Sequence, residues 1–173
     1  IRDYDVTGVQ TCALPICDSI IWCDSRAVEM GEQAFEAIGR GKCLDTLLNS
    51  PGNFTASKLG WVKAHEPDTY DQIHKFMLPG DYIAMKLSGE ITTTVGGLSE
   101  GMFWDFQGKQ VSKEVMDHFG FDTSIIPEVV PSIGEQVSVT SSVADELGLS
   151  PGVKITYRAG DQPSNAFSLG VLD

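Results

Sequence analysis

The segment of residues 156–166 carries the side chains whose chemistry is easiest to identify. Gly160, Asp161 and Gln162 follow an alternating apolar run, and Pro163 after them suits the first turn of a helix. This order predicts a strand, a turn and then a helix whose start displays a carboxylate. A positioned carboxylate can accept the proton of an alcohol while the alcohol oxygen attacks an electrophile. Asp161 is therefore a candidate general base, and a helix cap or turn residue is the structural alternative.

The elements that must position Asp161 are those of a mixed α/β domain. Val153, Ile155 and Tyr157 alternate as in a strand, and open α/β sheets bind ligands outside the carboxyl ends of their strands. Asp161 is thus expected to reach a cleft at such an edge. Periodicity, caps and breakers predict the remaining elements. The predicted strands lie at residues 19–23 and 76–78. Three predicted helices cover residues 55–65, 70–75 and 112–119. Three others run from a cap at Asp24 or Ser25 to Gly39, from a cap at Asp81 to Gly89, and from a capping box at Ser142 to Gly148.

The composition is that of an ordinary globular protein with an acidic excess. The 173 residues include 24 acidic and 12 basic side chains, for a formal net charge of -12. This charge repels nucleic-acid phosphates and anionic membrane surfaces, so neither is an expected partner. No apolar run reaches the roughly 18 residues of a transmembrane helix, and no export signal is recognisable. We therefore expect a cytoplasmic protein.

The cysteines and histidines form no pattern of a metal site. The cysteines are unequally spaced without a C-x-x-C pair, which favours reduced thiols over a zinc site or a disulfide framework. The histidines lack the paired spacing of metal ligands and are expected at helix surfaces or in loops. The residues concerned are Cys12, Cys17, Cys23, Cys43, His65, His74 and His118.

Residues 1–17 are set aside in predicting the fold. They show no sustained helical or strand period, and residues 6–16, VTGVQTCALPI, resemble the translation of a common sequencing adapter. Such a segment is excluded from fold reasoning. We interpret residues 1–17 as an artefact or an unstructured segment, and a genuine divergent loop is the alternative.

Other conspicuous residues favour structural roles. Residues 96–101, GGLSEG, offer glycines but no lysine, so they predict an ordinary turn instead of a phosphate-binding loop. Trp22, Trp61 and Trp104 are interpreted as packing residues of the core or of a domain edge, with sugar stacking as the alternative. Arg26 is expected to form a structural ion pair, with a catalytic contact as the alternative.

Four blocks of residues, taken in order, resemble the FGGY family of carbohydrate kinases. The first two are similar to the family's W-x-D-x-R block and to its first signature, built on F-T-x-x-K-L-x-W. The third is similar to its L-P-x-D-Y and T-G-E stretch, and the fourth to the segment that holds its proton-accepting aspartate. The blocks are IWCDSR at 21–26, NFTASKLGWV at 53–62, LPGDY at 78–82 with LSGE at 87–90, and GDQ at 160–162 with NA at 165–166. The resemblance rests on the whole set and covers the chain from Ser19 onward.

The resemblance implies a fold and a reaction. The expected fold is α/β, the later part of the first domain of an actin-like, ribonuclease-H-like two-domain kinase. It would cover residues 18–167, with residues 168–173 starting the connection to a second domain. Within the family the chain is most similar to xylulokinases, with glycerol kinases and ribulokinases more distant. The implied reaction is ATP-dependent phosphorylation of D-xylulose to D-xylulose 5-phosphate. A kinase for glycerol or another ketose, and a non-catalytic sugar-binding module, are the alternatives.

The resemblance also implies roles for three residues. Asp161 would accept the proton of the sugar's primary hydroxyl, and Gln162 would hydrogen-bond a sugar hydroxyl or serve as a helix N-cap. Asn53 departs from the family signature, which usually has glycine or an apolar residue there, so it is either a contact to a sugar hydroxyl or a neutral loop amide. ATP and Mg²⁺ are the implied cofactors. Because their sites would lie mostly outside this chain, the chain alone is expected not to transfer phosphate. A homodimer is left open.

Overall fold

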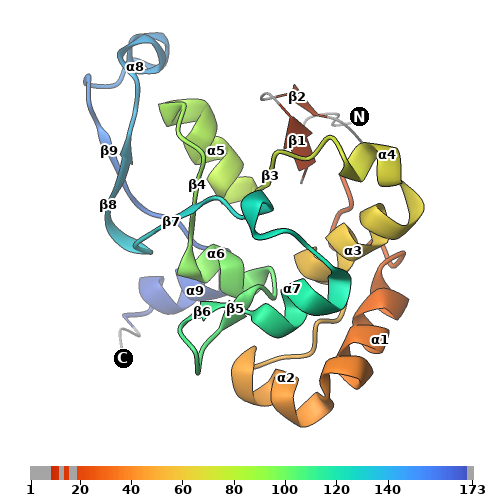
Figure 1. Ribbon diagram of the computed structural model, residues 1–173. Helices are drawn as coiled ribbons and strands as arrows, with labels where there is room; N and C mark the ends of the chain where they lie inside the picture. The colour runs from red at the N-terminus through yellow and green to blue at the C-terminus, as the bar shows by residue number, and fades with distance from the viewer. Residues whose placement is uncertain (1–8, 12–13, 16–18, 171–173) are drawn as a thin grey trace. The chain divides into compact units, whose positions relative to one another are not determined.

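The computed structural model describes residues 9–11, 14–15 and 19–170, with side-chain burial from residue 19 onward except at Phe167. Figure 1 shows the helices and strands of this part of the chain. The chain divides into two compact units. The first unit is formed by the chain up to Phe76 together with Leu98–Ile126, and the second by Met77–Gly97 together with the chain from Pro127 onward.

The first unit is mainly helical. Its described residues form helices α1 (Val28–Ile38), α2 (Arg40–Thr46), α3 (Thr55–His65), α4 (Pro67–Tyr70) and α7 (Lys113–Phe119), and a 3-10 turn, η1 (Thr123–Ile125). They also form the short strands β1 (Val9–Thr11), β2 (Leu14–Pro15), β3 (Lys75–Phe76), β5 (Trp104–Asp105) and β6 (Gln110–Val111). β1 pairs antiparallel with β2 and β3, and β5 pairs antiparallel with β6.

Helices α1, α3 and α7 enclose the core of the first unit. α1 packs against both α3 and α7 (Figure 1). Ala34 of α1, Leu59 and Val62 of α3, and Val115 and Met116 of α7 are buried there. Because each helix places its apolar residues on one face, packing these faces together removes most of that apolar surface from water.

A lysine from α3 closes the C-terminal end of α7. Gly120 ends this helix in the left-handed conformation, with a φ of 62°. The Lys63 ammonium donates to the backbone oxygens of Phe119 and Gly120, and its Nζ lies 5.3 Å from the ring centroid of Tyr70. A cation is favourable here because the last carbonyls of a helix carry partial negative charge.

Replacing Lys63 with methionine is expected to lower the free energy of unfolding by about 1 to 2 kcal/mol, because the helix-end hydrogen bonds and the charge are lost while the stem is kept. Urea unfolding followed by circular dichroism measures the change. The matched control is Lys113→Met at the other end of α7, where an exposed ion pair with Asp117 contributes little. Equal losses in the two variants would contradict a capping role for Lys63.

The second unit combines two small sheets with helices. β4 (Thr92–Thr94) pairs parallel with β7 (Glu128–Val130). β8 (Ile133–Ser138) pairs antiparallel with β9 (Lys154–Tyr157), with an irregular register between Ile133 and Val137. The helices of this unit are α5 (Pro79–Ser88), α8 (Ser141–Leu147) and α9 (Asp161–Ser168), and α6 (Val95–Glu100) spans the change from the second unit to the first. No helix in the described part of the chain has the length and apolar content needed to cross a bilayer.

Three predicted elements are present at their expected positions. The helix predicted at residues 55–65 is α3, in which Leu59 and Val62 are buried. The helix predicted at residues 112–119 is α7, which starts at a Ser112 cap whose hydroxyl accepts the N–H of Val115. The predicted alternating strand before Asp161 is β9.

The strand predicted at residues 19–23 is wrong. These residues form a loop in which the Asp24 N–H donates to the Ile21 carbonyl. Ile21 and Trp22 are 49% and 86% exposed, so the apolar run is not buried in a sheet. The Asp24 carboxylate does not cap α1. It pairs with Arg26 at 2.7 Å, which confirms the structural ion pair expected for Arg26.

The packing interpretation of the tryptophans holds in part. Trp22 does not pack into a core, whereas Trp61 is half-buried and stacks on His65 with ring centroids 4.6 Å apart. The Arg26 guanidinium lies 4.8 Å from the Trp61 ring centroid. Trp104 is half-buried in β5. The sequence does not distinguish an exposed tryptophan ring from a buried one, because the residues that would cover the ring are distant in the chain.

Two helices differ from the prediction because proline starts them. Pro67 and Pro79 each occupy a first-turn position, in α4 and α5. The helix predicted at residues 70–75 is therefore wrong, since α4 ends at Tyr70. Asp81, predicted as the cap, lies inside the first turn of α5, and Leu78 occupies the N-cap position.

Two other local predictions are also wrong. Thr140, not Ser142, caps α8 through its hydroxyl. Residues 96–100 lie in α6 instead of forming a turn.

The N-terminal segment is described in part. Within residues 1–17, β1 pairs with β2 on one side and with β3 on the other, and the other positions lie outside the described residues. A segment of foreign origin can still adopt a strand conformation next to a free strand, so this pairing does not test its origin. The interpretation of residues 1–17 as an artefact stays a prediction.

Candidate functional site

Asp161 is the first residue of α9, and its side chain is exposed to solvent. β9 ends at Tyr157, and residues 158–160 connect it to the helix. The carboxylate Oδ1 accepts the backbone N–H of Gln162 at 2.8 Å, which orients the side chain at the helix start. The predicted order of strand, turn and helix is therefore present.

The strand before Asp161 differs from its expected setting. β9 pairs antiparallel with β8, and within the described residues the parallel pairing is that of β4 with β7. Asp161 reaches solvent from a connecting segment and a helix start, and not from the edge of a broad parallel sheet. A general base needs access to the alcohol it deprotonates, and this position provides that access.

Gln162 lies beside Asp161 in the first turn of α9 and is also exposed. Its side-chain Nε2 is 3.5 Å from Asp161 Oδ2. The two side chains therefore form a small polar pair at the start of the helix. The capping alternative is not what the contacts show, because Gln162 supplies the N–H that Asp161 accepts.

Asn53 lies in the first unit, in the loop before α3. Its Nδ2 donates to the backbone oxygen of Asp24 at 2.7 Å and to that of Trp22 at 3.3 Å. Its Oδ1 is buried and has no hydrogen-bond partner among the described residues. The side chain thus joins the 22–24 loop to the start of α3. Asp161 and Gln162 are neighbours in the second unit, whereas Asn53 belongs to the first unit.

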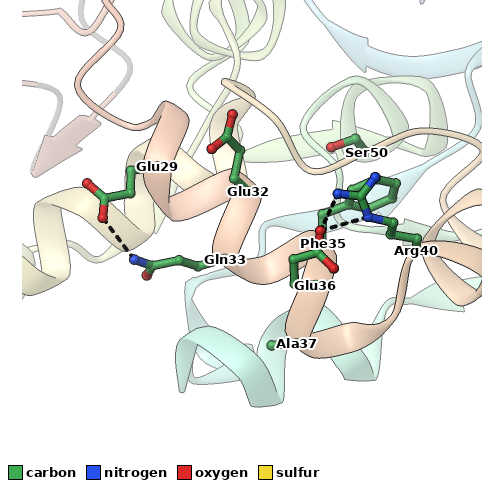
Figure 2. A pocket seen from close by; sticks show the side chains of 8 residues that line it. All are labelled: Glu29, Glu32, Gln33, Phe35, Glu36, Ala37, Arg40 and Ser50. Carbon is green, nitrogen blue, oxygen red and sulfur yellow. Dashed lines mark hydrogen bonds and ion pairs between the residues drawn. The ribbon is translucent and has the colours of Figure 1, made fainter.

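A surface pocket in the first unit is lined mainly by residues of α1 (Figure 2). Figure 2 shows Gln33 turned toward Glu29, and Arg40 turned toward Glu36, with which each forms a hydrogen bond. Its glutamates outnumber its single arginine, so the pocket repels phosphate groups. The lining residues are Glu29, Glu32, Gln33, Phe35, Glu36, Ala37, Arg40 and Ser50, which include none of the predicted site residues.

A buried polar cluster in the second unit was missed in the sequence analysis. The side chains of Arg158 and Asp81 are 6% and 4% exposed, with Arg158 Nε 3.8 Å from Asp81 Oδ1. The Thr93 hydroxyl donates to Asp81 Oδ2 at 2.8 Å, and Arg158 Nη2 donates to the Thr92 hydroxyl at 3.0 Å. These four residues are named the Arg158 cluster.

The Arg158 cluster links three elements of the second unit. Asp81 belongs to α5, Thr92 and Thr93 belong to β4, and Arg158 follows β9. The chain is packed closely around it, because a Cβ at Gly97 would lie 3.2 Å from Thr93 Oγ1 and 3.5 Å from Asp81 Oδ2. The run of three threonines, at positions where a strand is buried on both faces, is the sequence signal that could have indicated a polar interior.

Burial is the largest influence on the pKa values of Asp81 and Arg158, the charged pair of this cluster. Burial raises the pKa of the Asp81 carboxyl, although the Thr93 hydroxyl and Arg158 favour its ionised form. Burial also lowers the pKa of the Arg158 guanidinium, against the attraction of Asp81. The mutual attraction of the pair therefore does not fully offset the loss of solvent.

Two features of the described residues bear on metal and phosphate binding. Among them, no group of three or more His, Cys, Asp and Glu side chains could hold a metal ion. Gly96 and Gly97 lie inside the short helix α6, and the Gly97 N–H donates to the Thr94 hydroxyl. This segment therefore offers no open loop of N–H groups for a phosphate.

Sequence and structure comparisons agree on one group of proteins. The pattern of the FGGY family of carbohydrate kinases, N-terminal domain, matches residues 8–168. A xylulose kinase of Staphylococcus xylosus is 30% identical over 92% of this chain and 33% of its own length. A solved "xyloylose kinase" from Brucella ovis is 26% identical, with a TM-score of 0.74 over 84% of this chain and 30% of that chain. A glycerol kinase of Plasmodium falciparum, 18% identical, shares the fold with a TM-score of 0.82 over 95% of this chain and 33% of that chain.

The comparisons confirm the expected fold class. The solved relatives are sugar kinases of the actin-like α/β type, and the chain spans about a third of the length of the relatives it matches. The match to the family pattern extends over most of the sequence. The chain therefore belongs to the FGGY family of carbohydrate kinases and corresponds to part of their N-terminal domain.

Proposed function

We propose that this chain is part of a longer ATP-dependent kinase, the full-length protein, that phosphorylates D-xylulose to D-xylulose 5-phosphate. The observation that carries the chemistry is the exposed Asp161 carboxylate at the start of α9, within the GDQ block. The similarity to proteins named xylulose kinase supports the choice of sugar. A small sugar and ATP are thus the proposed partners.

Asp161 acts as the general base in this proposal. The primary hydroxyl oxygen of the sugar forms a bond to the γ-phosphorus of ATP, and the bond from that phosphorus to the ADP oxygen breaks. The hydroxyl proton passes to the Asp161 carboxylate. An alcohol is a weak nucleophile, so a carboxylate that accepts its proton lowers the barrier, by roughly 10²- to 10⁴-fold in rate.

Gln162 and Asn53 are the proposed sugar-binding residues. Gln162 is exposed next to Asp161, so its amide can hydrogen-bond another hydroxyl of the same sugar. Asn53 Oδ1 lacks a partner among the described residues but is buried, and its Nδ2 is already used to join two loops. Gln162 is therefore the stronger candidate of the two.

ATP and Mg²⁺ are proposed to be held mainly by other parts of the full-length protein. The structure of a glycerol kinase with ADP supports ATP as the phosphate donor in this family. Phosphoryl transfer depends chiefly on alignment and on neutralising charge. Among the described residues no group of three or more His, Cys, Asp and Glu side chains could hold a metal ion, and the Gly96–Gly97 segment is helical. This chain alone is therefore expected not to transfer phosphate from ATP to a sugar.

The test is ADP release by the full-length protein with D-xylulose, D-ribulose, glycerol or no sugar. We expect D-xylulose to show the highest kcat/KM, at least about tenfold above glycerol, because a smaller polyol leaves hydrogen-bonding groups of the site unpaired. The 173-residue chain under the same conditions should release no more ADP than a blank. Preference for glycerol or another ketose would replace the substrate assignment. Sugar binding without turnover would favour a non-catalytic module.

A further inference from the structure

The side chains of α9 whose burial is described contribute little buried surface. Among its side chains with described burial, Ser164 and Ala166 are half-buried and the others are exposed. The helix has 8 residues, too few to be stable through backbone hydrogen bonds alone. The segment that leads into α9 therefore contributes to fixing its position.

Arg158 is the buried residue of that segment. It is 8% exposed, whereas Ala159 and Gly160 are half-buried. Its guanidinium contacts Thr92 in β4 and Asp81 in α5. At most about 10 Å of chain separates Arg158 from Asp161, and the Gly160 carbonyl already accepts the Ser164 N–H of α9. A shift of the Arg158 anchor is thus transmitted directly to the helix start.

The hydrogen bonding of Arg158 is incomplete. Among the described residues, its Nε and Nη1 have no hydrogen-bond partner, and Nε is 3.8 Å from Asp81 Oδ1, beyond hydrogen-bond length. A buried guanidinium with unpaired donors is a poor source of stability, because its lost hydration is not fully replaced. Departures of this kind from good local packing are expected at functional sites.

We propose that the Arg158 cluster positions the 158–160 segment, and through it the Asp161 carboxylate, for proton transfer from the sugar. Arg158 is a positioning residue in this proposal, since it acts through the backbone and touches neither the sugar nor the phosphate. The proposal rests on the proposed function of Asp161. It makes the geometry of the base depend on a contact to α5 and β4, which are distant from it in the sequence.

The first test compares Arg158→Met with the double variant Asp81→Leu/Arg158→Met in the full-length protein. Arg158→Met leaves Asp81 buried without its cation, so its melting temperature should fall. The double variant removes both charges and should recover most of that loss. At a temperature where all variants are folded, both should retain the KM for sugar within about threefold but show a kcat at least about tenfold below wild type. If the double variant regained its kcat as well as its melting temperature, the role of the Arg158 cluster would be purely structural.

A second readout separates this proposal from the proposed function. Backbone amide hydrogen exchange over residues 159–164 should accelerate in both variants, while the amides of α8 should keep their wild-type rates. If the wild-type full-length protein phosphorylates no sugar, the kinase function fails, and the exchange data alone judge the positioning role. Unchanged exchange over residues 159–164 would overturn that role whatever the activity.

Discussion

An Asp161→Asn variant of the full-length protein is expected to lose roughly 10²- to 10⁴-fold in kcat for sugar phosphorylation, because an amide cannot accept the hydroxyl proton. The KM for the sugar should change by less than about threefold, since the amide keeps the shape and a hydrogen-bond acceptor. The fold should be retained. Asp161 is exposed, and an asparagine oxygen can still accept the Gln162 N–H that the carboxylate accepts. Steady-state ADP release and thermal unfolding measure the two effects.

The matched control for this variant is Asp145→Asn. Asp145 is an exposed carboxylate in α8 of the same unit, so its replacement should leave kcat at the wild-type value. If Asp161→Asn also kept kcat within about threefold of wild type, Asp161 could not be the general base. Its role would then be that of a residue at a helix start.

Gly31→Ala is expected to destabilise the protein by about 2 kcal/mol or more. A Cβ at Gly31 would lie 1.8 Å from the Gly52 oxygen and within 2.7 Å of two further backbone atoms of Gly52. Overpacking of this kind costs about 1 to 3 kcal/mol or more, which exceeds the roughly 1 kcal/mol that alanine gains over glycine in a helix. Backbone atoms cannot rotate aside, so α1 or the loop at residues 50–53 must move. Urea unfolding followed by circular dichroism measures the loss.

Gly41→Ala is the control, because it places the same change in a helix without a neighbour. Gly41 is exposed in α2, and a Cβ there would meet nothing within 4 Å. We expect it to stabilise the protein by about 0.5 to 1 kcal/mol, through helix propensity and a more restricted unfolded chain. Stabilisation by Gly31→Ala as well would contradict the close approach of α1 to Gly52.

The secondary structure was predictable where a helix carried both its start and its stop signal. Ser112 and Gly120 define α7 through contacts within a few residues of the chain. The run at residues 19–23 lacked such signals, and its apolar character alone suggested a strand. A strand forms only where a partner supplies hydrogen bonds, and here residues 19–23 form a loop and turn instead.

The candidate site was predictable to a similar extent. The GDQ block identified Asp161 and Gln162, and the structure places both at an exposed helix start. The contacts of Asn53 to the 22–24 loop were not predictable, because its partners lie 29 and 31 residues away. The Arg158 cluster was missed for the same reason.

The sequence by itself determined the family, the bounds of α3 and α7, and the carboxylate of the GDQ block, Asp161, at a helix start. These features depend on residue types at fixed short spacings. Only the tertiary structure decided that Gly31 must remain a glycine while Gly41 need not, and that Arg158 is buried against Thr92, a residue 66 positions away. Burial and close approach are produced by segments that are distant in the chain, and no local pattern records which segments will meet.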